Sequence, residues 1–444
     1  MKTKSSPKRN LILIITLFFM PVWVNAQEVM QYFRPNSKLG VNQFETSKID
    51  SVKFTGLKVK IGANSELSYQ TLRDQNNGNV SLIQLTNAFQ LPMANLNLDV
   101  QLADGVRANI TTYLSSRRHE EVWMKGGYLQ FDKLPFLHNP YIDNIMKNIT
   151  IRVGQGDADY GDEHFRRSDG GNTIYNPFIE NYIMDEFSAE IGAHVYYHNN
   201  SGLFLMTAVT NGELNPTVYA PTQVDAATNK INKYDPVFLG KIGFDKQLNN
   251  DFRLRISGSF YTLNSGSGNG LFDGDHTGSH YFGVMENQVL ANTYTLTNEN
   301  DYSPFSGRLD PGFSEEVHAF MGNVFLKYKG LELFGTVENV TGRTINEAKN
   351  RTVNQYACDV IYRFPQGKEN FWVGMRYNTV TALLPGATTN ITINRTAASL
   401  GWFLTNNLMM KTEYVNQEYL NYQAPDILAG GKFNGMVFEF SLGF

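Results

Sequence analysis

The sequence of 444 residues has a single cysteine, Cys358, so no disulfide can form within the chain. Charged residues are also scarce, at 18%, and the formal net charge is −4. After the first segment of the chain, no apolar run approaches the roughly 20 residues that a spanning helix needs. These deficits argue against a disulfide-rich domain and a bundle of membrane helices. Basic residues do not outnumber acidic residues, which argues against a nucleic-acid partner.

Aromatic residues and glycines are abundant instead. The chain has 30 Phe, 23 Tyr and 38 Gly, yet its mean hydropathy is only −0.32. Strands with one face toward lipid and one toward water combine these two properties, because every second side chain is free to be polar. The length is compatible with several soluble domains or with one large barrel. The composition favours the barrel.

The first 26 residues have the three parts of a secretory signal peptide. Four basic residues precede an apolar run from Leu11 to Met20, and Val24, Asn25 and Ala26 form the cleavage motif. We therefore predict that residues 1–26 are removed on export. The alternative, an uncleaved anchor, is disfavoured because the apolar run is too short to cross a bilayer.

From Leu57 to the last residue, apolar side chains recur at every second position in short runs separated by turn residues. We predict an all-β fold, a transmembrane antiparallel up-and-down β-barrel over residues 55–444, with about 16 strands in a range of 14–18. The predicted strands are 57–70, 95–102, 106–115, 122–132, 149–155, 186–198, 203–210, 236–247, 252–263, 316–329, 331–340, 353–364, 371–380, 391–404, 408–416 and 433–444.

The final strand ends in an alternating series of apolar and aromatic residues, Phe438, Phe440, Leu442 and Phe444. This ending resembles the signal that outer-membrane barrels present to their assembly machinery. Because it places the last strand end in the periplasm, the connections should alternate between short periplasmic turns and long extracellular loops. The long loops are expected at 71–94, 157–185, 211–235, 264–315, 341–352 and 417–432.

Two segments depart from this pattern. The periplasmic connection 133–148 is long, and we expect a brief helix over residues 141–146. Residues 27–54 do not alternate, and they are predicted to form a periplasmic N-terminal segment, either a tail or a stretch tucked into the barrel mouth. Aromatic side chains at strand ends are expected to form interfacial girdles. The candidates are Tyr196, Tyr197, Tyr328, Phe364 and Tyr419.

The loop at 157–185 has a high density of charges of both signs. We interpret it as a loop that folds into the lumen, where opposed acids and bases would sort solutes by charge. The alternative is a solvated surface loop. The candidate constriction residues are Asp157, Asp159, Asp162, Glu163, Arg166, Arg167 and Asp169. Basic residues on the polar phase of their strands are predicted to line the lumen: Lys58, Lys60, Arg152, Lys241, Arg253, Arg255, Arg363 and Arg376.

The sequence has only weak signals of a catalytic or metal-binding site. The stretch from Asp157 to Glu163 has the oxygen density of a calcium loop, but Gly161 lies one place too early for an EF-hand. His198 and His276 each have a serine three positions later, without a clear orienting acid. Cys358 falls on the outward phase of its strand, where we expect a buried apolar side chain rather than a nucleophile. We predict no enzyme, no metal site and no cofactor.

The signal peptide, the sixteen strands, the strand Ile151 to Gln155 that leads into a charged loop, and the terminal Phe444 together resemble Gram-negative outer-membrane porins. The most similar group is the phosphate-selective porin O and P superfamily, in the divergent form common in Bacteroidetes. The resemblance covers about residues 55–444 and implies a trimeric sixteen-stranded channel with a loop-formed constriction. The chain lacks the dense Arg and Lys ladder of phosphate-specific members, which puts phosphate selectivity in doubt.

These observations predict an outer-membrane porin for passive diffusion of small hydrophilic solutes or ions. The expected partners are outer-membrane lipid, the barrel-assembly machinery, the solutes and, by resemblance, further copies in a homotrimer. The alternative is a non-conducting barrel that acts as a scaffold or receptor through the loops 211–235 and 264–315. A transporter of hydrophobic ligands is a third hypothesis, disfavoured because the inward face of the strands is polar.

Overall fold

The computed structural model describes residues 29–78, 80–90, 92–115, 122–169, 171–213, 222–266, 268–274, 277–287 and 306–444. The predicted signal peptide and His276 lie outside these residues, as do parts of the long loops 211–235 and 264–315.

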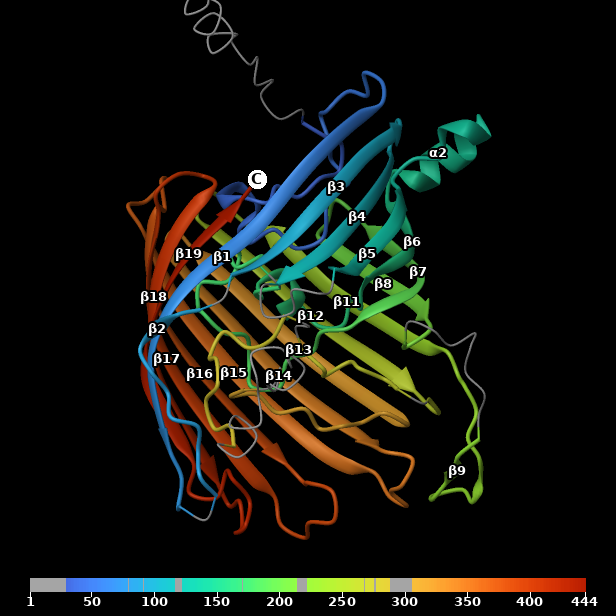
Figure 1. Ribbon diagram of the computed structural model, residues 1–444. Coiled ribbons are helices and arrows are strands. Elements are labelled where there is room, and N and C mark those ends of the chain that lie inside the picture. The colour runs from blue at the N-terminus through green and yellow to red at the C-terminus, as the bar shows by residue number, and fades with distance from the viewer. Residues whose placement is uncertain are drawn as a thin grey trace, which may run out of the picture.

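Sixteen antiparallel strands form one closed barrel, in which each strand pairs with its neighbours in sequence (Figure 1). They are β1 (Lys58–Gln75), β3 (Met93–Ala103), β4 (Val106–Ser115), β5 (Val122–Phe131), β6 (Ile149–Asp157), β7 (Ala189–His198), β8 (Leu203–Thr210), β11 (Val237–Gln247), β12 (Phe252–Leu263), β13 (Glu316–Tyr328), β14 (Leu331–Arg343), β15 (Arg351–Phe364), β16 (Phe371–Ala382), β17 (Ile391–Phe403), β18 (Leu408–Leu420) and β19 (Lys432–Gly443). The barrel closes where β1 pairs with β19, from Asn64 opposite Gly443 to Gln75 opposite Lys432. The predicted fold class and strand number are confirmed.

The remaining elements are short. They are β2 (Ala88–Phe89), which pairs with β1, the hairpin β9 (Val224–Asp225) and β10 (Lys230–Ile231), the helix α2 (Pro140–Met146), and the 3-10 turns η1 (Lys38–Gly40), η2 (Pro135–Leu137) and η3 (Glu163–Phe165). The predicted brief helix is α2, which begins where the Asn139 side chain accepts a hydrogen bond from the Tyr141 amide. Among the described residues, no helix has the length and apolar character to cross a membrane.

On the long strands β13 to β17, the outward face is apolar near the periplasmic turns and polar toward the extracellular end. On β16, Phe371, Val373, Met375 and Tyr377 are exposed to the outside of the barrel, and Thr379 follows them. Such a belt matches the apolar band, about 25 Å tall, of transmembrane barrels. The lipid-facing part of the wall therefore begins at the periplasmic turns, and the strands extend beyond it.

An aromatic girdle marks the periplasmic edge of this belt. Its rings stack in series, with centroids 5.4 to 6.1 Å apart: Tyr362, Phe364, Phe371 and Trp402. Cys358 also lies on the outward face, but it is exposed to the membrane side rather than covered by protein. The predicted girdle positions Tyr196 and Tyr419 are wrong. Both side chains point into the lumen, where they are 8% and 3% exposed, because they fall on the inward phase of their strands.

Three segments fold into the lumen and pack on its inward side chains. We call them the N-terminal segment (residues 29–54), the inner loop (residues 158–188, between β6 and β7) and the β12–β13 connection (residues 264–315, of which the structure describes a part). In the inner loop, Phe178 is fully buried against Ile361 and Trp372. Leu271 and Phe313 of the β12–β13 connection pack likewise on inward apolar residues nearer the extracellular end. The inward face is thus not uniformly polar, and protein covers its apolar part.

The N-terminal segment lies across the periplasmic mouth. Gln31 donates a hydrogen bond to Asp104 in the β3–β4 turn, at 3.0 Å. The Lys38 amide donates to the Asn406 carbonyl in the β17–β18 turn, at 2.8 Å, and the Lys48 ammonium donates to the Asp132 carbonyl after β5, at 2.9 Å. Figure 1 shows this dark-blue segment at the same end of the barrel as α2 and the C-terminus.

Candidate functional site

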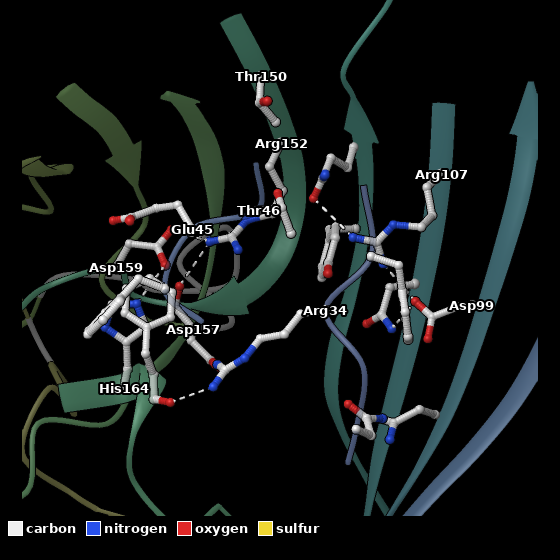
Figure 2. A pocket seen from close by; sticks show the side chains of 18 of the residues that line it. Arg34, Glu45, Thr46, Asp99, Arg107, Thr150, Arg152, Asp157, Asp159 and His164 are labelled. Carbon is white, nitrogen blue, oxygen red and sulfur yellow. Dashed lines mark hydrogen bonds and ion pairs between the residues drawn. The ribbon is translucent and has the colours of Figure 1, made fainter. Parts of the chain in front are cut away.

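A cavity of about 260 Å³ remains between the inward face of β3–β7, the inner loop and the N-terminal segment (Figure 2). This volume is far above the roughly 15 Å³ that one water molecule requires, and its lining is polar enough to hold water. Five basic and five acidic side chains line it: Arg34, Arg107, Lys125, Arg152, Arg167, Glu45, Asp99, Asp157, Asp159 and Asp169. The cavity is therefore a charged space with room for several water molecules.

The barrel wall supplies one charged side of the cavity. Asp99 on β3 forms an ion pair with Arg107 on β4, at 2.8 Å, and Arg107 also donates to Gln130 on β5, at 3.2 Å. Because side chains alternate along a strand, these polar groups face the lumen while Ile110 and Leu129 face lipid. The tight β3–β4 turn places Asp99 and Arg107 almost opposite each other.

The inner loop supplies the opposite side, and Asp159 fastens it to the wall. The Asp159 carboxylate contacts Arg152 and Tyr196 of the wall and lies 3.2 Å from His164 of the loop. Figure 2 shows Arg152, Asp159 and His164 converging on one corner. Burial alone would raise the pKa of Asp159, but Arg152 and the two histidines His164 and His194 hold it well below its usual range. Asp159 therefore stays ionised.

The N-terminal segment contributes Arg34, whose charge is not balanced by any acid among the described residues. Its guanidinium donates to the carbonyls of Phe165, at 2.8 Å, and Gly40, at 3.0 Å, and it stacks over the Tyr175 ring at 3.7 Å. The other four basic residues of the lining each form an ion pair with an aspartate. Within the described part of the chain, Arg34 has no such carboxylate contact.

The predicted constriction residues divide into two groups. Asp157, Asp159, Arg167 and Asp169 line the cavity. The other three lie on the far side of the inner loop: Asp162 pairs with Arg255 at 2.7 Å, Glu163 is buried near Glu186, and Arg166 contacts Asn42 and lies 3.8 Å from Glu332. Acids and bases therefore touch in ion pairs instead of facing each other across open water.

The predicted lumen cations all lie on the inward phase, but only Arg152 lines the cavity. Their partners are the Val29 carbonyl for Lys58, the Phe33 ring for Lys60, Asp162 for Lys241 and Arg255, Asp245 for Arg253, Glu332 for Arg363 and Asp359 for Arg376. These cations hold the inserted segments and neighbouring strands together. Their role in permeation remains a prediction.

Sequence reasoning missed several lining residues. Asp99 and Arg107 could have been found, because they lie on the polar phase of two strands joined by a predicted tight turn. Arg34 and Glu45 could not, because the N-terminal segment lacks the periodicity that would fix its position. His198 stacks on Phe204 at 6.1 Å, and the Ser201 hydroxyl donates to Asn199 at 2.6 Å, so this His and Ser do not form a catalytic pair.

Two buried carboxyls make the inner loop sensitive to pH. Burial raises the pKa of Glu163 well above its usual range, and neighbouring Glu186 raises it further. Burial and nearby Glu338 do the same to the pKa of Glu186. The folded state thus binds these protons more tightly than the unfolded state, so their stabilising contribution is present at low pH and is lost as pH rises above the usual Glu value.

The melting temperature in detergent is therefore expected to fall as the pH rises from about 5 to about 9. Glu186→Gln, which keeps the size but removes the charge, should raise the melting temperature at the alkaline end by about 2 °C or more. Glu418→Gln, at an exposed position on β18, is the control and should leave the profile unchanged. A wild-type melting temperature that rises with pH over this range would contradict the raised pKa values of Glu163 and Glu186.

Comparisons with known proteins agree with the fold. No protein-family model and no curated protein matches the sequence. Among solved structures, OprB of Pseudomonas putida aligns with a TM-score of 0.50 at 8% identity, over 88% of this chain and 94% of that one. The outer membrane channel DcaP of Acinetobacter baumannii aligns with a TM-score of 0.48 at 10% identity, over 88% and 99% of the two chains. An anion-selective porin from Comamonas acidovorans gives 0.47 at 9%, over 87% and 100%.

At these identities the likeness concerns the fold alone. A closed sixteen-stranded antiparallel barrel with an apolar outward belt is a multi-pass β-barrel of the outer membrane.

Proposed function

We propose that this barrel is a porin that lets small hydrophilic solutes diffuse along the β3–β7 wall. The observation that supports it most is the charged cavity, because it is a space wide enough for water beside the segments that fold into the lumen. Barrels of 16 to 18 strands are wide enough for an aqueous channel. The inner loop would set the width on one side and the N-terminal segment on the other. No step of this proposal requires a cofactor.

The finer parts of the proposal rest on the sequence. The motif from Ile151 to Gln155 and the terminal Phe444 support membership of the phosphate-selective porin O and P superfamily, and that resemblance implies a homotrimer. Phe438, Phe440 and Leu442 all point outward at the closing strand, where an assembly machinery could contact them. Catalysis forms no part of the proposal.

The proposal predicts stepwise, ion-conducting insertions when purified protein is added to a planar lipid bilayer. Arg34 should favour anions, since it is the cavity cation without an acidic partner in the described chain. Arg34→Gln is therefore expected to shift the anion-to-cation permeability ratio toward cations by about twofold or more. Lys329→Gln serves as the control, because Lys329 is half-exposed in a periplasmic turn and pairs with Asp251. Equal shifts in both variants would contradict the role of Arg34.

A second function is favoured by the filled lumen. A barrel closed by its own segments suits a scaffold or receptor that acts through its extracellular loops. The hairpin β9–β10 extends from the barrel at the extracellular end (Figure 1) and exposes Val224 and Ile231, while Arg343 holds its base through Asp225 at 2.6 Å. The same bilayer recording separates the two functions, because a scaffold gives no current.

A further inference from the structure

Three side chains from distant parts of the chain meet at the closing seam of the barrel. Glu66 lies on β1, Glu439 lies on β19, and His280 belongs to the β12–β13 connection. Their ligand atoms all lie within 4.8 Å of one another, and each side chain is at most 1% exposed. Within the described residues, this is the group of such side chains close enough to share one ion.

The distances between these atoms match those around a bound ion. His280 Nδ1 lies 3.4 Å from Glu66 Oε2 and 3.7 Å from Glu439 Oε2. Two ligands held about 2.1 Å from a tetrahedral zinc ion lie about 3.4 Å from each other. A central ion would therefore fit between these groups with small side-chain movements.

Buried polar atoms that lack a hydrogen-bond partner in the described chain also indicate that an ion could bind here. Within the described residues, Glu439 Oε2 and His280 Nδ1, the nitrogen that faces both carboxylates, are buried without a hydrogen-bond partner. The other carboxylate oxygen of Glu439 is occupied, since it accepts from Ser441 at 2.7 Å and lies 3.2 Å from Lys411 Nζ. Leaving buried polar atoms unpaired is costly, so an occupant for Oε2 is expected.

We propose that Glu66, His280 and Glu439 bind one divalent transition-metal ion, for which zinc is the best match. One imidazole nitrogen and two carboxylate oxygens form a donor set that suits zinc, whereas calcium and magnesium prefer all-oxygen sites with more ligands. The ion would tie the β12–β13 connection to the seam where the first and last strands meet. The site is independent of whether the barrel conducts.

Metal analysis of the purified protein tests this inference. After removal of metal with a chelator and dialysis against zinc chloride, wild type is expected to retain one zinc per chain. Glu439→Gln and His280→Asn should each lower the retained zinc at least tenfold. His318→Asn is the matched control, because His318 is partly exposed and pairs with Glu316 at 3.1 Å far from the seam. This variant should retain the ion.

Cobalt provides a second measurement that does not depend on the variants folding. Co²⁺ added to metal-free wild type should give the visible absorption of a low-symmetry site, saturating at one equivalent, and zinc should abolish it. Absence of stoichiometric zinc and cobalt binding in wild type would overturn the proposal and leave a protonated His280 between two carboxylates. Binding that persists in both seam variants would also overturn it, since the ion would then sit elsewhere.

Discussion

Deletion of residues 29–54 is expected to raise the single-channel conductance of this barrel severalfold. The N-terminal segment crosses the periplasmic mouth and touches turns on different sides of the barrel, after β3, β5 and β17. It precedes β1 and contributes no strand to the sheet, so the sixteen-stranded wall does not depend on it. Its removal would expose the cavity directly to the periplasm and widen the opening at the periplasmic mouth.

The control for this deletion is replacement of residues 135–147 by a short Gly-Asn turn. That stretch contains α2, which projects from the same rim but away from the mouth (Figure 1), so its loss should leave conductance unchanged. Heat-dependent migration on gels reports whether each variant is folded. A folded deletion variant with wild-type conductance would show that the N-terminal segment does not limit the flow.

Replacement of Arg255 by Met should have the second-largest effect, because Arg255 joins the barrel wall to the inner loop and to the N-terminal segment. Its guanidinium on β12 donates to Asp162 of the inner loop at 2.7 Å, and to Glu45 of the N-terminal segment at 2.6 Å. Arg255 is 1% exposed. Removing one member of such a buried cluster typically costs about 3–5 kcal/mol, because the remaining charges stay buried without their partner.

A cost of that size would favour release of the inserted segments by two orders of magnitude or more. Bilayer recordings of Arg255→Met should show larger and noisier open levels, and limited proteolysis should cut the inner loop. Lys246→Met is the control, since Lys246 also carries a positive charge and lies on the neighbouring strand β11, but its side chain is exposed. Indistinguishable recordings from the two variants would contradict the proposed role of Arg255.

The barrel could be predicted from the sequence because strand periodicity reports directly which face each side chain occupies. The strand from Phe252 to Leu263 alternates with two arginines, and both point inward as the pattern requires. The helix α2 was predictable for a similarly local reason, an Asn-Pro pair that caps and starts it. Strand ends were less certain, since β1 and β18 extend past the lipid belt where polar residues replace apolar ones.

The alternation of apolar and polar residues could not predict which segments fold into the lumen. Alternation separates the two faces of a sheet, but it does not indicate whether water or another segment covers the inner face. The Trp372 indole on β16 donates to the Pro177 carbonyl of the inner loop at 3.1 Å, although the two residues are 195 positions apart in the sequence. Glu66 and His280 likewise meet only in the folded chain. Such contacts depend on long-range packing of loops that have no regular period.

The proposed diffusion path is tested most directly by measuring whether a charged thiol reagent reaches the cavity while current flows through the barrel. In a Cys358→Ser background, which removes the lipid-facing thiol, Asn109→Cys places a thiol in the cavity and Ser399→Cys places one on the opposite wall, where it is 2% exposed. A membrane-impermeant sulfonated thiosulfonate should reduce the current through the Asn109→Cys protein and leave the Ser399→Cys protein unchanged. Block at Ser399→Cys alone, or no current from either protein, would contradict a path along the β3–β7 wall.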